Sequence, residues 1–216
     1  MRLLKKEFRL CLHPTCLVMP LLSALVLVPG YPYGVCCFYT ALALFFVCLT
    51  AREDHDAAYT LTLPVTRRDA VNARVLFSVC VEVIQLIVMG LFILLKALIG
   101  PMENPAGLDA GTALIGEGFL IYALFNGIFF PVYYRDILKP GKAFLTASAA
   151  VFVLICLEIV ATYTVPFVRD RLDTLDPQYL TEKTVFTLIA AALFGLGTYL
   201  AARRSAKEFD RVDLSL

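Results

Sequence analysis

Three carboxylates lie inside apolar stretches that are long enough to cross a lipid bilayer. They are Glu82, Glu117 and Glu158. A charge at the centre of a bilayer costs about 2.5 to 3.5 kcal/mol on insertion scales, so each side chain is expected to face protein or a water-filled cavity and not lipid. In such surroundings a carboxylate can hold a proton, attract a cationic cargo or accept hydrogen bonds within a helix bundle.

Helical spacing gives two of these carboxylates polar neighbours. At steps of four, three and four residues, one stripe of a helix contains Ser78, Glu82, Gln85 and Met89. A shorter stripe, one turn long, contains Glu158 and Thr162. The first stripe is the more polar of the two.

Two interpretations of these groups are open. In the first, Glu82 and Glu158 line a substrate pathway at an inner and an outer depth, with Gln85 and Glu117 as further candidates. Such a pathway would favour cationic or amphipathic cargo. In the second, Glu117 reaches the membrane interface and the other glutamates are protonated or hydrogen-bonded inside the bundle.

Other combinations of reactive side chains do not predict catalysis or metal binding. The run Glu53-Asp54-His55-Asp56 holds several potential ligands, but consecutive residues in a helix do not share a face. His13 and His55 both fall on the expected cytoplasmic side, so no Ser/His/Asp or Cys/His set can form at one membrane depth. The seven cysteines contain no C-x-x-C pair and imply neither disulfides nor zinc. We expect no catalytic residue, metal or cofactor in this chain.

The composition indicates an integral membrane protein. Hydrophobic residues make up 60% of the 216 residues and charged residues only 17%, whereas roughly a quarter of a soluble domain is charged. This length supplies about six helices of roughly 20 residues and leaves no room for a soluble catalytic domain. We therefore predict one all-α membrane domain over residues 1–216. The net charge of +1 and the dispersed basic residues give no reason to expect nucleic acid as a partner.

The hydropathy pattern predicts an N-terminal interfacial helix and six membrane spans. Residues 1–13 form an amphipathic helix whose basic face contains Lys5, Lys6 and Arg9, and its long charged segment favours retention over cleavage as a signal peptide. Pro20 interrupts the first span. Between the last two spans, residues 166–183 have room for one or two short surface helices. The spans are expected near residues 15–28, 33–50, 75–98, 112–134, 144–165 and 184–202.

Basic residues predict the orientation of the spans. Fifteen of the 19 Lys and Arg residues fall in the N-terminal segment, the second loop, the fourth loop and the tail at 203–216. Both termini are therefore expected in the cytoplasm, which requires an even number of spans. Lys96 lies near the outer end of the third span, where its stem is expected to snorkel to the interface.

The longest polar break, residues 53–74, is the expected working surface. Asp54 to Leu61 can form about two helical turns, and Pro64 then ends the helix. Thr66 and Asp69 have the spacing of a capping box, so a new helix should begin near Arg67. That helix continues without a breaker into the third span. A force on the turn would therefore move the span.

The same break carries a resemblance to a known family. Its run LPVTRRDAVNAR, residues 63–74, resembles the "LPvsRkeiVlaKy" run of ABC-2 type transporter permeases, with Arg74 where that family usually has Lys. In that family the run joins spans two and three and lies near the ATPase. Two weaker similarities are LLKKEF at residues 3–8, which resembles the family's N-terminal elbow helix, and the charged ending FDRVDL at residues 209–214.

The resemblance implies a transport subunit whose ATPase is a separate chain. No G-x-x-x-x-G-K-[ST] motif occurs, so ATP and Mg²⁺ are expected on that partner. A second permease protomer, identical or related, and membrane lipids are the other expected partners, in a bacterial cell membrane. The resemblance assigns ATPase coupling to the residues of the turn, namely Asp54, Tyr59, Leu63, Pro64, Thr66, Arg67, Arg68 and Asp69.

The resemblance favours an exporter of a peptide or an amphipathic toxin. A non-transporting immunity or scaffold protein of the same fold is an alternative, and a membrane-embedded enzyme is a weaker one. The last span carries small residues along one face, which allows close helix packing. This face contains Thr187, Ala191, Gly195 and Ala202. We expect it to pack against helices of the same bundle and not against a second protomer.

Overall fold

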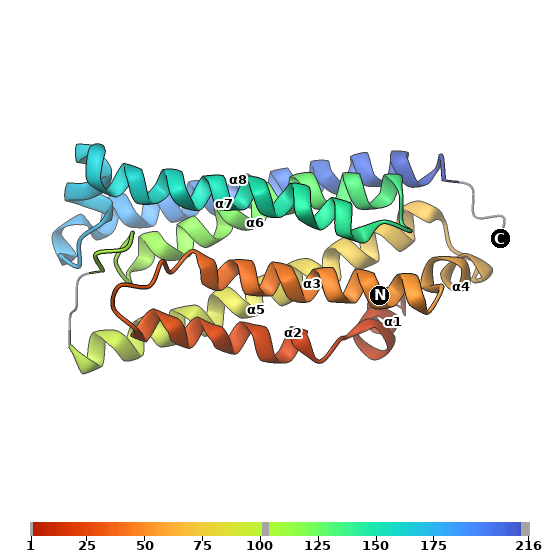
Figure 1. Ribbon diagram of the computed structural model, residues 1–216, viewed down its shortest axis with the longest axis horizontal. Coiled ribbons are helices and arrows are strands. Elements are labelled where there is room, and N and C mark those ends of the chain that lie inside the picture. Colours follow the sequence, from red (N-terminus) through yellow and green to blue (C-terminus); the bar gives the residue numbers. More distant parts are fainter. Residues whose placement is uncertain (1, 101–103, 213–216) are drawn as a thin grey trace.

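A computed structural model describes residues 2–100 and 104–212. Its long helices lie side by side in a bundle (Figure 1). Within these ranges the structure consists of helices and loops, which confirms the expected all-α class. In chain order the elements are α1 Arg2–Lys6, η1 Glu7–Cys11, α2 Thr15–Val18, η2 Met19–Leu27, α3 Val35–Glu53, α4 Asp56–Thr62, α5 Arg67–Ile99, α6 Thr112–Arg135, α7 Pro140–Thr164, η3 Val168–Leu172, η4 Pro177–Tyr179 and α8 Leu180–Phe209.

Five helices of the described chain, α3 and α5 to α8, are long and apolar enough to cross a membrane. A sixth span results if the bent N-terminal pair is counted as one, because the segment at 3–11 meets the segment at 15–27 at 95°. The bend falls where Pro14 disfavours helical geometry at His13. With the bent pair counted as one span, the total is the six that the sequence predicts.

The first span needs few residues to cross the membrane, because most of it is 3-10 helix, which rises further per residue than an α-helix. Four α-helical residues precede nine residues of 3-10 helix, and Pro20 is the second residue of that 3-10 segment. Rises of about 1.5 Å and 2.0 Å per residue give this segment a length of roughly 24 Å, which is most of a hydrocarbon core of about 30 Å. The interruption predicted at Pro20 therefore coincides with the change of helix type.

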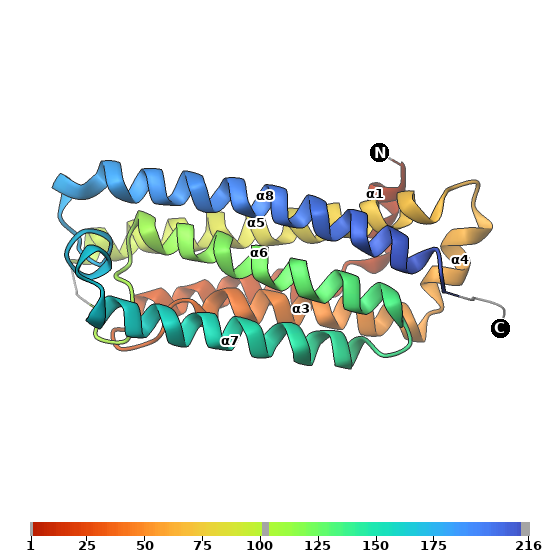
Figure 2. The ribbon, with the colours of Figure 1, turned by 90° about the horizontal axis from the view of Figure 1, so that it is seen from above.

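The two ends of the described chain lie at the same end of the bundle (Figures 1 and 2). The turn between α4 and α5 is also at this end, whereas the connections before α3, α6 and α8 are at the other. This arrangement fits an even number of crossings. Cytoplasmic placement of this end stays a prediction from the basic residues.

Helix boundaries differ most from the sequence prediction in the last two spans. α7 begins at Pro140, four residues before the predicted start, because proline at the first helical position loses no hydrogen bond. α8 extends past the predicted span at both ends and takes up much of the expected tail, whose residues 213–216 lie outside the described chain. The two short helices η3 and η4 confirm the expectation for residues 166–183.

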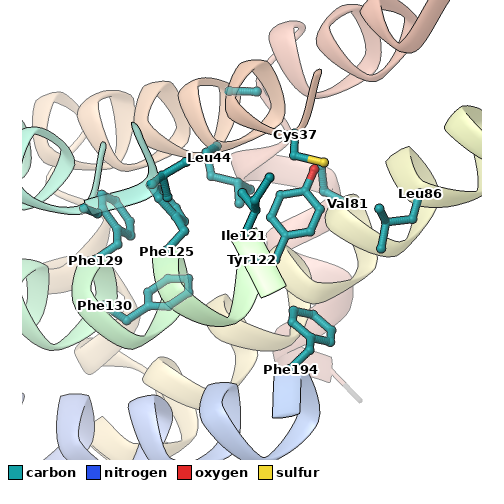
Figure 3. Packing of buried hydrophobic residues seen from close by; sticks show 14 of the residues in the cluster. Cys37, Leu44, Val81, Leu86, Ile121, Tyr122, Phe125, Phe129, Phe130 and Phe194 are labelled. Atoms are coloured by element: carbon teal, nitrogen blue, oxygen red, sulfur yellow. The ribbon is translucent and has the colours of Figure 1, made fainter. Parts of the chain in front are cut away.

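Helix α6 is the centre of the core and contacts α3, α5, α7 and α8. A Cβ atom on Gly116 would lie 2.8 Å from the Phe186 ring and 3.1 Å from the Thr187 backbone, so this glycine allows the close approach of α8. Along the other face of α6, Phe125 and Phe129 stack with ring centroids 4.9 Å apart (Figure 3). The helix is therefore fixed on several sides.

The small residues of α8 do not share one environment. Thr187 Oγ1 donates to the Thr112 carbonyl oxygen at 2.9 Å and Ala202 is buried, so both pack within the bundle. Gly195 is exposed, and a Cβ atom there would meet nothing within 4 Å. The favoured packing within one bundle therefore holds for only part of this face.

Candidate functional site

The polar break folds into the predicted helix, turn and helix. α4 ends at Thr62, and Leu63 adopts extended geometry before Pro64. The capping box is present, because the Asp69 N–H donates to Thr66 Oγ1 and the Thr66 N–H donates to Asp69 Oδ2, both at 3.1 Å. α5 then runs for 33 residues from Arg67. The turn is continuous with a full membrane span, as the sequence predicted.

A buried network of charges joins this unit to the N-terminal segment. Arg74 Nε lies 2.5 Å from Glu7 Oε2, and its Nη2 atom donates to Asp56 Oδ2 at 2.6 Å. Lys6 Nζ contacts Asp56 Oδ1 at 2.5 Å and Glu7 Oε1 at 3.3 Å, and it donates to Thr60 Oγ1 at 2.7 Å. Two cations and two carboxylates therefore connect α1, η1, α4 and α5.

Burial makes this network structurally important. Arg74 and Glu7 are only 5% and 3% exposed. Glu7, Cys11 and Asp56 are close enough together to resemble a metal site. However, Lys6 and Arg74 already contact both carboxylates, and Arg74 Nη2 lies 3.4 Å from Cys11 Sγ. This donor set fits ion pairing and not a cation site.

The N-terminal helix is less simply amphipathic than the sequence indicated. Lys5 and Arg9 are exposed as expected, but Lys6 turns inward to the charge network. Leu10 is 66% exposed, while Phe8 packs on the Phe77 ring at a centroid distance of 5.0 Å. The separation into a basic face and an apolar face is therefore wrong for Lys6, because its ion pair with α4 outweighs its preference for water.

Arg67 differs from the other residues of the proposed coupling set. Its Nη1 atom donates to the carbonyl oxygens of Phe209 at 2.5 Å and Val212 at 2.7 Å, and its guanidinium lies 5.4 Å from the Phe209 ring centroid. Arg67 thereby caps the C-terminal end of α8. Leu63 is partly buried, and the remaining members are exposed, namely Asp54, Tyr59, Pro64, Thr66, Arg68 and Asp69.

A groove of about 490 Å³ opens beside α4 at the same end of the bundle. It is lined by α3 and α4 on one side and by the loop after α6 and the end of α8 on the other. Arg135 Nε and Glu208 Oε2 form an ion pair at 3.3 Å within this lining. The groove and the exposed turn together form a surface that could receive a partner.

Inside the bundle, the Asn126 amide links Glu82 to Thr198 and so joins three helices. Glu82 is the acceptor on α5. Its Oε2 atom accepts a hydrogen bond from Asn126 Nδ2 at 3.0 Å, and the same amide nitrogen donates to Thr198 Oγ1 at 3.2 Å. These residues come from α5, α6 and α8. Among the described residues, Glu82 Oε1 and Asn126 Oδ1 have no hydrogen-bond partner.

Gln85 forms a second polar junction one turn further along α5. Its Nε2 atom donates to Ser23 Oγ at 2.9 Å, and its Oε1 atom accepts from the Tyr122 hydroxyl at 2.9 Å. The Tyr122 hydroxyl points toward Cys37 (Figure 3). The predicted stripe is confirmed as one buried face, with exposures of 0 to 2% at Ser78, Glu82, Gln85 and Met89.

Glu117 and Glu158 lie near the end of the bundle that is opposite the turn between α4 and α5. Glu158 Oε1 accepts from the Leu108 N–H at 2.8 Å. Glu117 is only 4% exposed and lies against Gly34, so it does not reach the surface as one interpretation expected. Lys96 is also buried, and its ammonium donates to the Tyr33 hydroxyl, so its charge is held by the protein; its position at the membrane interface stays a prediction. Both side chains lie against the first loop, residues 28–34 between η2 and α3, where Lys96 contacts Tyr33 and Glu117 contacts Gly34.

Several polar partners were not selected from the sequence. They are Lys6 and Glu7 at the charge network and Ser23, Tyr122, Asn126 and Thr198 inside the bundle. Asn126 carried a usable signal, because an amide in the middle of an apolar span needs a partner. The pairing of Glu7 with Arg74 had no such signal, because it joins segments 67 residues apart in sequence.

Comparison with known protein families identifies a match over most of the chain. A family model described as ABC-2 family transporter protein matches residues 2–202. No curated protein and no solved structure matches the chain. The match includes the N-terminal segment, the helical turn at 56–69 and all the spans up to most of α8.

Proposed function

Because the chain belongs to the ABC-2 transporter family, we propose that it is the permease of an ATP-driven exporter. A separate ATPase subunit binds ATP and Mg²⁺, and its hydrolysis drives efflux of a peptide or an amphipathic toxin. A second permease, identical or related, completes the transporter in the bacterial cell membrane. The termini and the turn at 53–74 face the cytoplasm, where the ATPase binds.

The charge network is the observation that best supports coupling. Because Arg74 contacts both Glu7 and Asp56, a displacement of α4 acts on α5 and on the N-terminal segment at once. The capping box fixes the start of α5 against the turn. Movement of a bound ATPase would therefore reach the membrane through a connected unit and not through a flexible loop.

The proposed ATPase-binding surface combines the exposed side of the turn with the groove beside α4. Tyr59 is 53% exposed and supplies an aromatic anchor on α4, and aromatic residues are enriched where protein interfaces are strongest. Arg68 supplies an exposed cation. Arg67 instead holds α8 against α5, so we assign it to positioning this surface and not to direct contact.

Cysteine crosslinking tests this binding surface. In a background without the native thiols, cysteines at Thr62 and Thr66 should crosslink to the co-expressed ATPase, since both positions are exposed beside the turn. A cysteine at Thr164, exposed at the opposite end of α7, is the matched control and should not crosslink. Labelling by soluble reagents alone at 62 and 66, with ATPase coupling intact after Arg68→Ala, would rule out docking at this turn.

The glutamate pathway makes a separate prediction. Glu82→Gln and Glu158→Gln remove the negative charge but keep an oxygen that can accept from Asn126 and from the Leu108 N–H. If these carboxylates attract cargo, both variants should lower export or cargo-stimulated ATP hydrolysis in vesicles while assembly with the ATPase stays normal. Asp170→Asn, which removes an exposed carboxylate from η3 at the other end of the bundle, is the control for loss of one carboxylate. Unaltered export in the double variant would leave both glutamates with a structural role only.

A further inference from the structure

A groove lined by four cations lies between the start of α5 and the end of α8. It has a volume of about 580 Å³, and its charged residues are Arg68, Arg203, Arg204, Lys207 and Asp210. All four basic side chains are exposed. Within the described part of the chain, none of the four belongs to an ion pair. One carboxylate against four cations leaves an excess of positive charge that favours an anionic ligand.

The groove lies at the expected boundary between hydrocarbon and headgroups. Lys183 and Arg203 are separated by 20 residues of α8, which corresponds to about 30 Å along a helix and to the thickness of a hydrocarbon core. The Arg203 guanidinium lies 5.0 Å from the centroid of the Tyr199 ring, and tyrosines are enriched at this level of a membrane. A ligand in the groove would therefore be at headgroup depth.

An exposed apolar face of α8 leads directly to the groove. At steps of four, three and four residues it contains Ile189, Leu193, Leu196 and Leu200, which are 44 to 58% exposed. The next positions on the same face are Arg204 and Lys207. An apolar surface that ends in cations matches a molecule with hydrocarbon chains and an anionic head.

We propose that this groove binds the phosphate headgroup of an anionic phospholipid whose acyl chains lie along the exposed face of α8. The groove is preformed, because Arg67 fixes the end of α8 to the start of α5 through the carbonyl oxygens of Phe209 and Val212. A headgroup that contacts Arg68 and Arg204 together bridges the two helices. A zwitterionic lipid gains less from the same cations, because its headgroup has no net charge.

Lipid titration of the full-length permease tests this site. The purified chain in detergent micelles is titrated with dioleoyl phosphatidylglycerol, dioleoyl phosphatidylcholine or inorganic phosphate, and the apparent affinity is taken from the thermal unfolding midpoint. Phosphatidylglycerol should stabilise the chain and phosphatidylcholine should do so much less. Each basic residue near an anionic lipid contributes about 1 kcal/mol, so the triple variant Arg68→Gln, Arg204→Gln, Lys207→Gln should bind phosphatidylglycerol roughly 100-fold more weakly.

A control variant separates this groove from general charge attraction. Lys139→Gln, Lys142→Gln and Arg211→Gln remove three exposed cations from the same end of the bundle, and this variant should keep its affinity for phosphatidylglycerol. If the triple groove variant does not fold, Arg68→Gln and Lys207→Gln are measured singly, and each should weaken binding several-fold.

Three outcomes would overturn the proposal. Equal loss of phosphatidylglycerol binding in the control variant would show attraction without a site. Stabilisation by inorganic phosphate equal to that by phosphatidylglycerol would assign the groove to a soluble anion. Unchanged lipid binding in the triple groove variant, with ATPase association lost when Arg204 and Lys207 alone are replaced, would make the groove a protein-binding surface.

Discussion

Replacing Arg74 by glutamine is expected to lower the free energy of unfolding by about 3 to 5 kcal/mol, the usual cost of removing one partner from a buried ion pair. The guanidinium contacts Glu7 and Asp56 at 2.5 and 2.6 Å, and the first of these carboxylates is almost fully buried. Without Arg74, only Lys6 remains to compensate two negative charges. Thermal or denaturant unfolding of the permease in micelles measures the effect.

Matched variants separate this effect from a general loss of charge. Arg68→Gln also removes an arginine from the first turns of α5, but Arg68 is exposed, so its stability should change by no more than about 0.5 kcal/mol. Arg74→Lys keeps the positive charge and introduces the residue that ABC-2 permeases usually have here. It loses the planar guanidinium that contacts two carboxylates at once, so we expect a loss of stability between those of the other two variants. Equal stability of the Arg74→Gln and Arg68→Gln variants would contradict a structural role for the network.

Coupling should fail together with the network. The Arg74→Gln variant should retain part of its ATPase binding, because the exposed side chains of the turn are unchanged, but transport per ATP hydrolysed should fall. A second substitution tests whether the partners act as a unit. The loss of stability in the double variant Glu7→Gln, Arg74→Gln should be smaller than the sum of the two single losses. With glutamine at position 7, removal of Arg74 no longer leaves a buried negative charge there without its cation.

Local rules in the sequence were enough to predict the turn and the spans. The end of α4 before Pro64 and the capping box of Thr66 with Asp69 depend only on residues within a few positions of one another, and both are confirmed. Hydropathy likewise identified every long apolar helix. The charged tail after residue 202 was expected to be partly helical, and α8 confirms this as far as Phe209. Hydropathy could not predict that the tail joins the span without a break, because a helix that leaves the membrane loses its hydropathy signal but keeps its hydrogen bonds.

Contacts between distant segments set the limit of this prediction. Glu7 belongs to a segment that reads as basic and amphipathic, and only the 95° bend after it brings its carboxylate to Arg74. Glu117 stands near the start of an apolar span, where hydropathy suggests an interface, yet it is buried against the first loop. In both cases tertiary packing determines where the carboxylate lies, and the periodicity of the sequence contains no information on such contacts.

Replacing Asn126 by leucine is expected to lower the free energy of unfolding by about 1 to 3 kcal/mol, because it leaves a buried acceptor without its donor. Asn126 Nδ2 is the donor to Glu82 Oε2, and Glu82 is fully buried among α5, α6 and α8. Thr198→Val is the matched control. It removes only the 3.2 Å contact to the same amide, and a hydrogen bond between membrane helices averages about 0.6 kcal/mol.

The second substitution decides whether the loss arises at Glu82. In Asn126→Leu, Glu82→Met, the carboxylate and its donor are both replaced by apolar side chains. Only the Thr198 hydroxyl then loses its contact, so much of the lost stability should return. Thermal unfolding in micelles measures the stability of the unchanged chain, the two single variants and the double variant, which together form a double-mutant cycle. Additive losses in the double variant would mean that the two residues do not act as a pair, and Glu82 would then have to be stabilised by another group.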